Sequence, residues 1–368
     1  MTLLTDDQKM LQDSAAGFLA GEGGPTKQLR HWRDTGCSDG FGNALWARFG
    51  ELGLSAVAIP ESHGGLGLGA VEGALILEEI GRNLTPSPFL MTAIVAARAL
   101  AGTAQADAWF PRVLAGDAIL SLAVDDGPHH APDAIELRAE RKGNGFVLSG
   151  TKQFVVHGHS ADMVVTAART AGGVTLFAVP KGAAEVENVA LVDGSKAARM
   201  RFDQLALDAD GVIGEVDGGG APLARALDAG RAGAAAELVG VAAGISAMTV
   251  DYLSQRKQFG RAIGEFQALQ HRAAHLHGEI EIARAAALKA ATLLDREDDR
   301  APLMVSVAKA KAADVARLAV REGVQMHGGI GMTDEHDAGL FMKRVAVLGP
   351  LFGDVHFHRE RVAALSGY

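Results

Sequence analysis

The sequence predicts an α+β protein in which two helical segments flank a strand-rich one. Apolar residues recur at helical spacing before residue 117 and after residue 215. The segment between them contains short β-branched or aromatic runs separated by turn residues. Because the strands are gathered in one segment and do not alternate with helices, α+β is favoured over a parallel α/β sheet. We therefore expect three domains, at residues 1–116, 117–215 and 216–368.

The first domain is expected to be helical. Thr5 and Gln8 have the spacing of a capping box ahead of the run MLQDSAAGFLA. Two later runs, FGNALWARFGELG at 41–53 and AVEGALILEEIGR at 70–82, repeat apolar residues at i, i+3 and i+4. The glycine-rich loop between them, IPESHGGLGLG at 59–69, lacks the strand–helix context of a dinucleotide-binding loop.

In the second domain the period of the apolar residues falls to two. Five short runs are separated by Gly, Asp, Pro and Asn. They are AILSLAV (118–124), FVLSGTKQFVV (146–156), DMVVTAAR (162–169), VTLFAVP (174–180) and RMRFDQLAL (199–207). This pattern predicts an antiparallel sheet folded as a sandwich or a barrel.

The third domain is expected to be a helical bundle. Apolar stripes at helical spacing mark four segments, and a proline opens the third of them. The expected helices are 223–252, about 266–294, 302–327 and about 354–366. Helices with such stripes bury them against one another.

Composition and motifs exclude several classes of function. The net charge is −9 and no block of Lys or Arg is present, so nucleic acid is not an expected partner. Cys37 is the single cysteine, which rules out an internal disulfide and a cysteine-based metal site. The pairs His271/His275 and His356/His358 lack zinc motifs, and no metal site is expected. Without a signal peptide or an apolar run of about 18 residues, we expect a soluble cytoplasmic protein with no membrane contact.

A charged patch interrupts two of the expected helices. In DYLSQRKQFGRAIGEFQALQHR (251–272), the residues RKQFG separate helical patterns on both sides. Arg256 and Gln258 supply hydrogen-bond donors, and Arg suits phosphate because its planar fork is permanently charged. Phe259 adds an aromatic ring, and Gly260 lets a ligand approach the backbone. A solvated turn between two helices explains the same residues equally well.

A second patch, VQMHGGIGMTDEH (324–336), follows the third expected helix. Gln325 precedes three glycines, Gly328, Gly329 and Gly331. One glycine is enough to end a helix. The additional glycines leave bare backbone amides, which a phosphate cradle requires.

Five stretches of this chain follow the pattern of one family. Its R-x-x-F-G…F-Q motif is matched by Arg256, Phe259, Gly260, Phe266 and Gln267. Its Q-x-x-G-G-x-G motif is matched by Gln325, Gly328, Gly329 and Gly331. The other matching stretches are IPESHGGLGL, FPRVLAGDAILSLAV and SGTKQFVVHGHSADMVVTAAR. In these stretches, and over essentially its whole length, the chain resembles the acyl-CoA dehydrogenase family.

The resemblance implies an N-terminal helical domain, a middle β-barrel, a C-terminal four-helix bundle and bound FAD. In this family the two motifs hold the flavin's diphosphate and adenosine at a subunit interface. The expected residues of this part of the cofactor site are Arg256, Gln258, Phe259, Gln267, Gln325, Gly328 and Gly329. The resemblance further implies an acyl-CoA substrate in fatty-acid or sterol side-chain β-oxidation. It also implies electron-transfer flavoprotein or a similar acceptor, and a homomeric or heteromeric dimer of dimers.

The resemblance also places Phe154 and Val156 against the flavin ring and Asp354 toward the cofactor. The chain departs from the family in the loop after the first strand, which reads VDDGPHHAPD (124–133). This loop lacks the usual Thr, whose oxygen helps to bind the flavin ring.

The implied reaction removes the α-proton of an acyl-CoA while the β-hydrogen leaves as hydride, and a carboxylate is the expected base. The family keeps this Glu in one of two places, which here hold Gly230 and Phe352. Glu237 is a substitute, because it lies seven residues beyond Gly230 on the same helix face among apolar neighbours. Asp228 and Asp354 are further carboxylates with shorter reach.

A structural role for Glu237 is the alternative, in which it pairs with an arginine of the next helix, such as Arg272 or Arg284. Three functions remain open at this point. They are an FAD-dependent acyl-CoA dehydrogenase, a flavin-binding subunit without a base in a heteromeric dehydrogenase, and a helical interaction protein that has lost flavin. The intact phosphate motifs disfavour the third. The small residues of DAGRAGAAA (228–236) predict room for a bulky or branched acyl chain, and they also suit close helix packing.

Overall fold

The first helix begins with the capping box expected from the sequence. In the computed structural model, which describes residues 4–368, the Thr5 hydroxyl accepts the Gln8 N–H at 3.2 Å. The Gln8 side chain accepts the Thr5 N–H at 3.0 Å. These two bonds satisfy backbone donors that a helix start leaves open, so α1 (Asp6–Glu22) begins at the predicted place.

The chain divides into two units. The helical unit contains the N-terminal segment up to His31, together with Ala70–Thr85 and Arg231–Tyr368. The sheet unit contains Trp32–Gly69 and Pro86–Gly230. The helices expected before residue 117 are therefore shared between the two units, and the three-domain boundaries stay a prediction.

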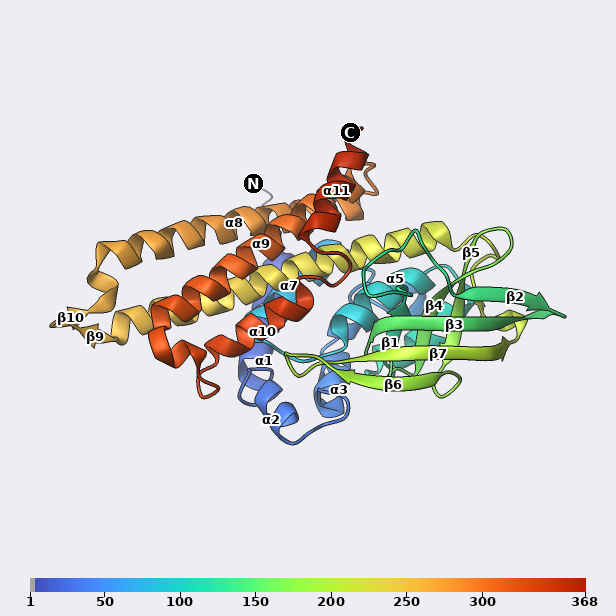
Figure 1. Cartoon of the computed structure of the whole chain (residues 1–368), viewed down its shortest axis with the longest axis horizontal. Coiled ribbons are helices and arrows are strands. Elements are labelled where there is room, and N and C mark those ends of the chain that lie inside the picture. Colours follow the sequence, from blue (N-terminus) through green and yellow to red (C-terminus); the bar gives the residue numbers. More distant parts are fainter. Residues whose placement is uncertain (1–3) are drawn as a thin grey trace. The chain divides into compact units, whose positions relative to one another are not determined.

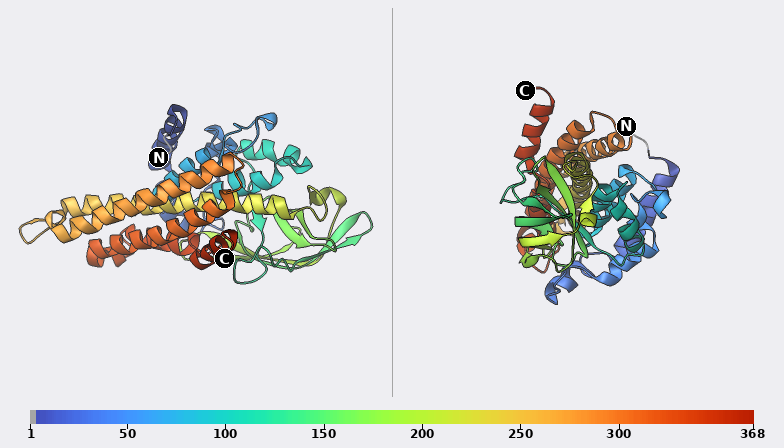
Figure 2. Two further views of the ribbon diagram at one scale, coloured as in Figure 1. Left: turned by 90° about the horizontal axis from the view of Figure 1, so that it is seen from above. Right: turned by 90° about the vertical axis from the view of Figure 1, so that its right-hand side faces the viewer.

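The C-terminal part of the chain is helical, as predicted (Figure 1). Its helices are α7 (Gly220–Gln255), α8 (Gln267–Asp295), α9 (Ala301–His327), α10 (Ala338–Leu348) and α11 (Val355–Leu365). The long helices α8 and α9 lie side by side, because a short connection turns the chain back on itself (Figure 2). The helix α10 was not predicted. Both α10 and α11 have 11 residues and are therefore much shorter than α7, α8 and α9.

Glycine allows α4 (Ala70–Arg82) to pack closely on α7 in the helical unit. A Cβ at Gly240 would overlap the carbonyl oxygen of Glu78, and one at Gly81 would overlap the carbonyl oxygen of Glu237. Helix backbones come this close only where the side chain is missing. These two glycines are therefore required by packing.

Among the described helices, α7 is the one that is long and apolar enough to cross a membrane, with an 18-residue window of mean hydropathy 1.5. Of that window, 72% is buried within the structure. A helix that is apolar on all sides and buried in this way is typical of a protein core.

The sheet unit is built on an eight-stranded mixed sheet. Its strands are β1 (Leu120–Ala123), β2 (Arg138–Lys142), β3 (Gly145–Val156), β4 (Met163–Arg169), β5 (Val174–Pro180), β6 (Glu185–Ala190), β7 (Lys196–Leu207) and β8 (Val212–Ile213). The hydrogen-bonded order is β6-β7-β3-β2-β4-β5-β8, and β1 pairs with β4 (Figure 1). The five predicted runs are strands, while β2, β6 and the short β8 are absent from the prediction.

This sheet differs from the predicted antiparallel barrel in two ways. β1 runs parallel to β4, with Leu120 opposite Met163. The path of paired strands ends at β6 and β8, and no pairing between them closes it within the described residues. The barrel prediction is therefore wrong, and the sheet is open. Alternation along a strand is the same in an open sheet and in a barrel, so the sequence pattern does not reveal closure.

Helices of the sheet unit fix the start of β1. They are α3 (Asn43–Glu51), a π-helical stretch (Leu90–Ala96) that continues into α5 (Ala97–Leu100), and α6 (Ala104–Leu114), while α2 (Leu29–Asp34) precedes α3. Trp46 of α3 donates its indole N–H to the Ala118 carbonyl at 3.1 Å. The Thr92 hydroxyl donates to the Leu120 carbonyl at 2.9 Å and accepts the Leu120 N–H at 3.0 Å. These bonds position the start of β1.

Candidate functional site

The interruption between α7 and α8 is a small hairpin (Figure 1). Strands β9 (Lys257–Gln258) and β10 (Arg261–Ala262) pair antiparallel around Phe259 and Gly260. Both turn residues have a left-handed backbone, with φ of +55° and +83°, as in a type I′ hairpin turn. Glycine adopts this conformation freely, whereas Phe does so at a cost. Phe259 is 90% exposed, so burial within this chain does not explain why an aromatic residue is placed there.

Arg256 stands at the foot of this hairpin with a fixed backbone and an exposed side chain. Its N–H donates to the Tyr252 carbonyl at 2.9 Å, and its carbonyl accepts the Ile263 N–H at 2.8 Å. Within the described part of the chain, its guanidinium forms no ion pair and donates no hydrogen bond. Gln258 and Gln267 are exposed as well. The hairpin and the start of α8 therefore present the Arg256 cation and two amide side chains to the outside of the chain.

The glycine turn, Gly328–Gly331, follows α9. Gly328 has φ of +68°, and its N–H donates to the carbonyl of the exposed Gln325, so it ends the helix. A Cβ at Gly328 or Gly329 would meet no atom within 4 Å, whereas one at Gly331 would press on the Val324 carbonyl at 3.0 Å. Gly329 has neither a left-handed backbone nor a close neighbour. Contacts within the described chain therefore give no reason for glycine at this position.

An aromatic stack brings the hairpin and the glycine turn together. The Tyr252 and His327 rings lie 4.6 Å apart between centroids. Tyr252 accepts the Arg256 N–H, and His327 directly precedes Gly328, so the stack links the two motifs. His327 donates from Nδ1 to the Gly323 carbonyl at 2.7 Å, and burial lowers the pKa of His327 despite this bond. We call residues 256–260 at the foot and turn of this hairpin, together with the glycine turn, the phosphate hook.

Phe154 and Val156 lie near the end of β3, where the strand bulges. The pairing of β3 with β7 shifts register between Lys152 and Val155. Phe154 in this bulge has φ of +51° and is 54% exposed, while Val156 is half-buried. A bulge turns a side chain away from the regular ladder, which accounts for an exposed aromatic ring here.

Buried charge holds both ends of the loop after β1. Lys152 is fully buried, donates from Nζ to the Val124 carbonyl at 2.6 Å and pairs with Asp126 at 2.9 Å. Burial lowers the pKa of Lys152, and the nearby Asp126 carboxylate opposes that shift. Asp126 also accepts the backbone N–H groups of Glu136 and Leu137. The loop that departs from the family pattern is therefore held firmly in place.

The two positions where the family keeps its base are linked by an arginine. Arg231 follows Gly230 on α7 and donates from Nε to the Phe352 carbonyl at 3.2 Å. Phe352 is buried and has a left-handed backbone, with φ of +59°. Neither Gly230 nor Phe352 has a side chain that can accept a proton, so no base stands at either position.

A buried lysine supports the same segment, residues 349–354, which we call the base loop. Lys309 of α9 is fully buried and donates to the carbonyls of Gly349 at 2.6 Å and Gly353 at 3.3 Å. Burial lowers the pKa of Lys309 to about 7; the Arg231 charge adds to the shift, and Asp354 opposes it. Asp354 is the N-cap of α11 and accepts the N–H of the third residue of that helix at 2.9 Å. Its orientation toward a cofactor stays a prediction.

Glu237 lies in a buried ion pair. It is 2% exposed, and its Oε1 accepts hydrogen bonds from Nε and Nη2 of Arg344 on α10, at 2.9 and 2.5 Å. The arginines suggested from the sequence, Arg272 and Arg284, pair with other glutamates. Glu237 therefore pairs with an arginine, as the structural alternative expected, but the arginine is Arg344 and not Arg272 or Arg284. A role for Glu237 as base stays a prediction. Asp228 is buried on α7.

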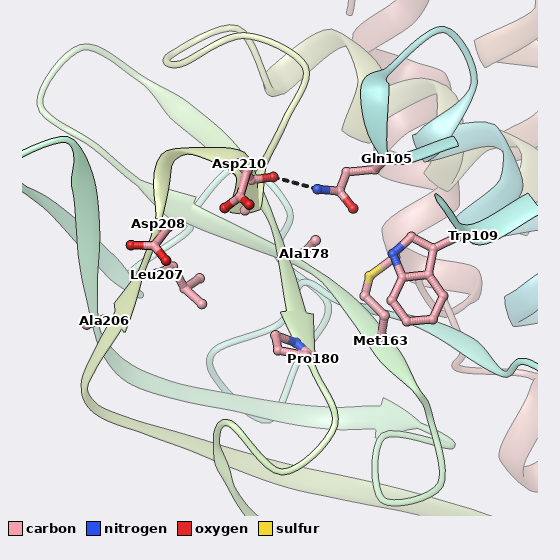
Figure 3. A pocket seen from close by; sticks show the side chains of 10 residues that line it. Gln105, Trp109, Met163, Ala178, Pro180, Ala206, Leu207, Asp208 and Asp210 are labelled. Atoms are coloured by element: carbon pink, nitrogen blue, oxygen red, sulfur yellow. Dashed lines mark hydrogen bonds between the residues drawn. The ribbon is translucent and has the colours of Figure 1, made fainter. Parts of the chain in front are cut away.

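A hollow of about 300 Å³ lies elsewhere on the sheet unit (Figure 3). Trp109 of α6 and Met163 of β4 stand on one side of it, and Asp208 stands on the other. None of the residues predicted for the cofactor or the base lines this hollow. Within residues 4–368, no group of three or more His, Cys, Asp or Glu side chains is placed to hold a metal ion.

Comparison with known proteins gives a consistent result. Family models of the acyl-CoA dehydrogenase N-terminal and C-terminal domains match residues 5–117 and 217–366. The acyl-CoA dehydrogenase IpdE2 of Mycobacterium tuberculosis is 33% identical over 343 residues, covering 92% of this chain and 91% of that protein. The cyclohex-1-ene-1-carbonyl-CoA dehydrogenase of Syntrophus aciditrophicus is 29% identical over 372 residues, covering 93% and 86%. Among solved structures, the ChsE4–ChsE5 complex from Mycobacterium tuberculosis matches with a TM-score of 0.90 and 25% identity over 100% of both chains.

The chain belongs to the acyl-CoA dehydrogenase family. Members of this family are FAD-binding flavoproteins, and FAD-dependent dehydrogenation of acyl-CoA is its function at the family level. The structure adds residues that the sequence analysis missed, namely Tyr252, His327, Arg231 and Lys309. A lysine inside the apolar run of α9 is a signal that could have identified the last of these.

Proposed function

We propose that this chain binds FAD through the phosphate hook and takes part in the α,β-dehydrogenation of an acyl-CoA thioester. One observation carries the proposal. The Tyr252–His327 contact joins the open glycine turn to the hairpin of Arg256, whose exposed side chain has no partner among residues 4–368. A helical interaction protein that no longer binds flavin has no physical need for Arg256 beside a glycine turn. This argues against the third function.

The residues of the phosphate hook fit a diphosphate. Arg256 offers a planar cation that can form paired hydrogen bonds to phosphate oxygens. A Cβ at Gly328 or Gly329 would meet no atom of the described chain within 4 Å, so both glycines leave room for a phosphate beside the turn. Bound FAD would supply the acceptor for the hydride that leaves the β-carbon. Phe154, exposed at the β3 bulge, is the proposed contact for the flavin ring.

A second function has support from a specific observation. Gly230 and Phe352 occupy both family base positions, and Glu237 is paired with Arg344. A chain of this kind could hold flavin phosphates while a different subunit provides the base. The similarity to a chain of the ChsE4–ChsE5 complex supports this candidate. We keep it as the alternative: a base-less subunit of a heteromeric acyl-CoA dehydrogenase.

Purification of the chain, alone and together with a co-expressed family member, separates these functions. We expect a flavin absorbance spectrum that bleaches when a saturated acyl-CoA is added without an electron acceptor. Flavin that no acyl-CoA reduces unless a second family member is present would favour the heteromeric subunit. A colourless protein that does not bind FAD on reconstitution would contradict both.

Replacement of Arg256 tests the phosphate hook directly. Arg256→Met should weaken FAD binding by about 10–100-fold, because it removes charge-assisted hydrogen bonds to phosphate. Arg261→Met is the matched control, since Arg261 lies in the same hairpin with its guanidinium 4.2 Å above the Phe266 ring. Equal FAD affinity in both variants would show that Arg256 does not bind the diphosphate of FAD.

The finer properties are proposals as well. A bulky or cyclic acyl group is supported by the relative named for cyclohex-1-ene-1-carbonyl-CoA. The small residues of 228–236 give less support, because Ala234 and Ala235 are fully buried and suit helix packing. A rate series that compares cyclohexanecarbonyl-CoA with butyryl-CoA tests this point, and a faster straight-chain substrate would contradict it. Electron-transfer flavoprotein as acceptor, a dimer of dimers and a cytoplasmic location complete the proposal.

A further inference from the structure

The loop after β1 contains a carboxylate–imidazole pair that is so far without a role. Both carboxylate oxygens of Asp125 lie 3.0 Å from Nδ1 of His130. An ionised carboxylate can only accept a hydrogen bond, so the proton of the neutral ring is assigned to Nδ1. Nε2 is then the nitrogen that can take up a proton. A carboxylate orients an imidazole base in the same way in the catalytic triad.

This pair is held in position before any ligand arrives. Oδ1 of Asp125 also accepts the Ala131 N–H at 3.1 Å, which closes the loop around the carboxylate. The carbonyl of Asp125 accepts the Gln153 N–H at 2.7 Å, which ties the loop to β3. The His130 side chain is 6% exposed and the Asp125 side chain 21%, so the imidazole is largely shielded from bulk water. A base with a locked orientation needs little reorganisation in order to react.

The pair lies in the part of the sheet unit that is proposed to face the flavin ring. Gln153, whose N–H bonds to Asp125, directly precedes Phe154 in the β3 bulge. The exposed Phe154 ring and the His130–Asp125 pair therefore stand on neighbouring backbone segments, joined by one hydrogen bond. The same loop lacks the threonine that is usual in the family, so its chemistry has changed where the ring contacts are expected.

The chain needs a base that its usual positions do not provide. Gly230 and Phe352 cannot accept a proton through their side chains, and Oε1 of Glu237 is occupied by two donors from Arg344. An imidazole oriented by a carboxylate can perform the same task as the missing glutamate.

We infer that His130, oriented by Asp125, is the base that removes the α-proton of the acyl-CoA. This inference rests on the proposed function, because it requires the thioester to bind beside Phe154. The α C–H bond breaks, its proton moves to Nε2 of His130, and its electron pair forms the α,β double bond. The β C–H bond breaks at the same time, and bound FAD would supply the two-electron acceptor for its hydride. The Asp125 carboxylate stabilises the imidazolium until its proton returns to solvent.

Exchange of α-hydrogens isolates this step from the oxidation. Phenylacetyl-CoA has acidic α-hydrogens, but its β-carbon is an aromatic carbon without hydrogen, so no hydride can leave. The FAD-reconstituted full chain is incubated with this probe in D₂O, and loss of the α-CH₂ proton signal is followed by NMR. The wild-type protein should exchange these hydrogens faster than buffer alone does. Exchange no faster than in buffer would overturn the inference.

Three variants assign the exchange to the proposed base. His130→Gln should slow it by at least about 100-fold, because general-base catalysis contributes this much or more. Asp125→Asn preserves the shape of the pair but favours the wrong tautomer, and it should slow exchange by at least about tenfold. His129→Gln removes the exposed neighbouring imidazole and should exchange at the wild-type rate.

Each outcome has a defined meaning. Flavin absorbance and cooperative melting show which variants are folded. If His130→Gln does not fold, the exchange rate of Asp125→Asn tests the inference instead. Wild-type exchange rates in His130→Gln, or in Asp125→Asn when only that variant folds, would overturn the inference. If such a variant still reduces its flavin with cyclohexanecarbonyl-CoA, the inference fails while the proposed function stands. A wild-type protein that binds no FAD would instead remove the proposed function itself.

Discussion

The phosphate hook and the base loop are built in opposite ways. In the phosphate hook, Arg256 and Phe259 are exposed, and contacts within the described chain give no reason for the glycine at 329. In the base loop, backbone carbonyls accept hydrogen bonds from the buried side chains of Lys309 and Arg231. Polar groups that a chain satisfies by itself need no ligand, whereas exposed donors are available to one. The phosphate hook therefore has donors that a ligand can reach, whereas the polar groups of the base loop are satisfied within the chain.

The largest expected effect comes from breaking an internally satisfied pair. Arg344→Met leaves the Glu237 carboxylate buried without its partner, and it should lower the free energy of unfolding by about 3–5 kcal/mol. Urea unfolding measures this loss. Glu237→Gln keeps a hydrogen-bonding group and is the control; it should exchange the α-hydrogens of phenylacetyl-CoA at the wild-type rate. Loss of that exchange in a folded Glu237→Gln would restore Glu237 as the base.

Two glycines sharpen the contrast between packing and binding. Gly240→Ala places a methyl group against the Glu78 carbonyl and should cost about 1–3 kcal/mol of stability. Gly329→Ala meets no atom of the described chain, so its stability should change by less than about 0.5 kcal/mol. FAD affinity should fall in Gly329→Ala, because the methyl group stands where a phosphate would approach. Titration of the apoprotein with FAD checks this, and an unchanged affinity would show that the turn binds nothing.

The buried amine of Lys309 predicts a dependence of stability on pH. Its pKa is about 7 in the folded chain and 10.5 ordinarily, so the unfolded chain binds this proton more tightly. Between these values stability must rise with pH, by about 2 kcal/mol from pH 7 to pH 9. Urea titrations at several pH values measure the slope. Lys309→Met should reduce that slope, and equal slopes in both proteins would mean that the lysine titrates normally.

The smallest effect is expected at the tip of the hairpin. Phe259→Asn relieves an unfavourable left-handed backbone and should stabilise the isolated chain by about 1 kcal/mol or less. The lost edge contact with the Phe266 ring offsets part of this gain. FAD binding should weaken at the same time, which thermal melting with and without FAD would detect. A lower melting temperature of the apoprotein would mean that the aromatic ring supports the fold.

Much of the fold could be predicted from the sequence, because local patterns report local structure. The Thr5/Gln8 capping box and the five strand runs are found as expected. The parallel pairing of β1 with β4 and the open ends of the sheet were not predicted. Pairing between distant strands depends on tertiary packing that a single run of residues does not record.

Part of the candidate site could also be predicted from the sequence, and part could not. The residues of the phosphate hook could be named from their motifs, since arginine and glycine have distinctive chemistry. The contact between Tyr252 and His327, which joins the hairpin to the glycine turn, could not be predicted. An aromatic contact between residues 75 positions apart has no sequence signature. Arg344 as the partner of Glu237 was missed for the same reason.

By itself, the sequence determined the order of helical and strand-rich segments, the phosphate motifs and the absence of glutamate from both family base positions. Periodicity and residue chemistry are properties of short segments, so they can be read without a structure. Only the tertiary structure decided that Glu237 pairs with Arg344 and that Asp125 accepts a hydrogen bond from His130. Those pairs depend on the three-dimensional path of the chain, which sets the distance between groups and therefore what each one can do.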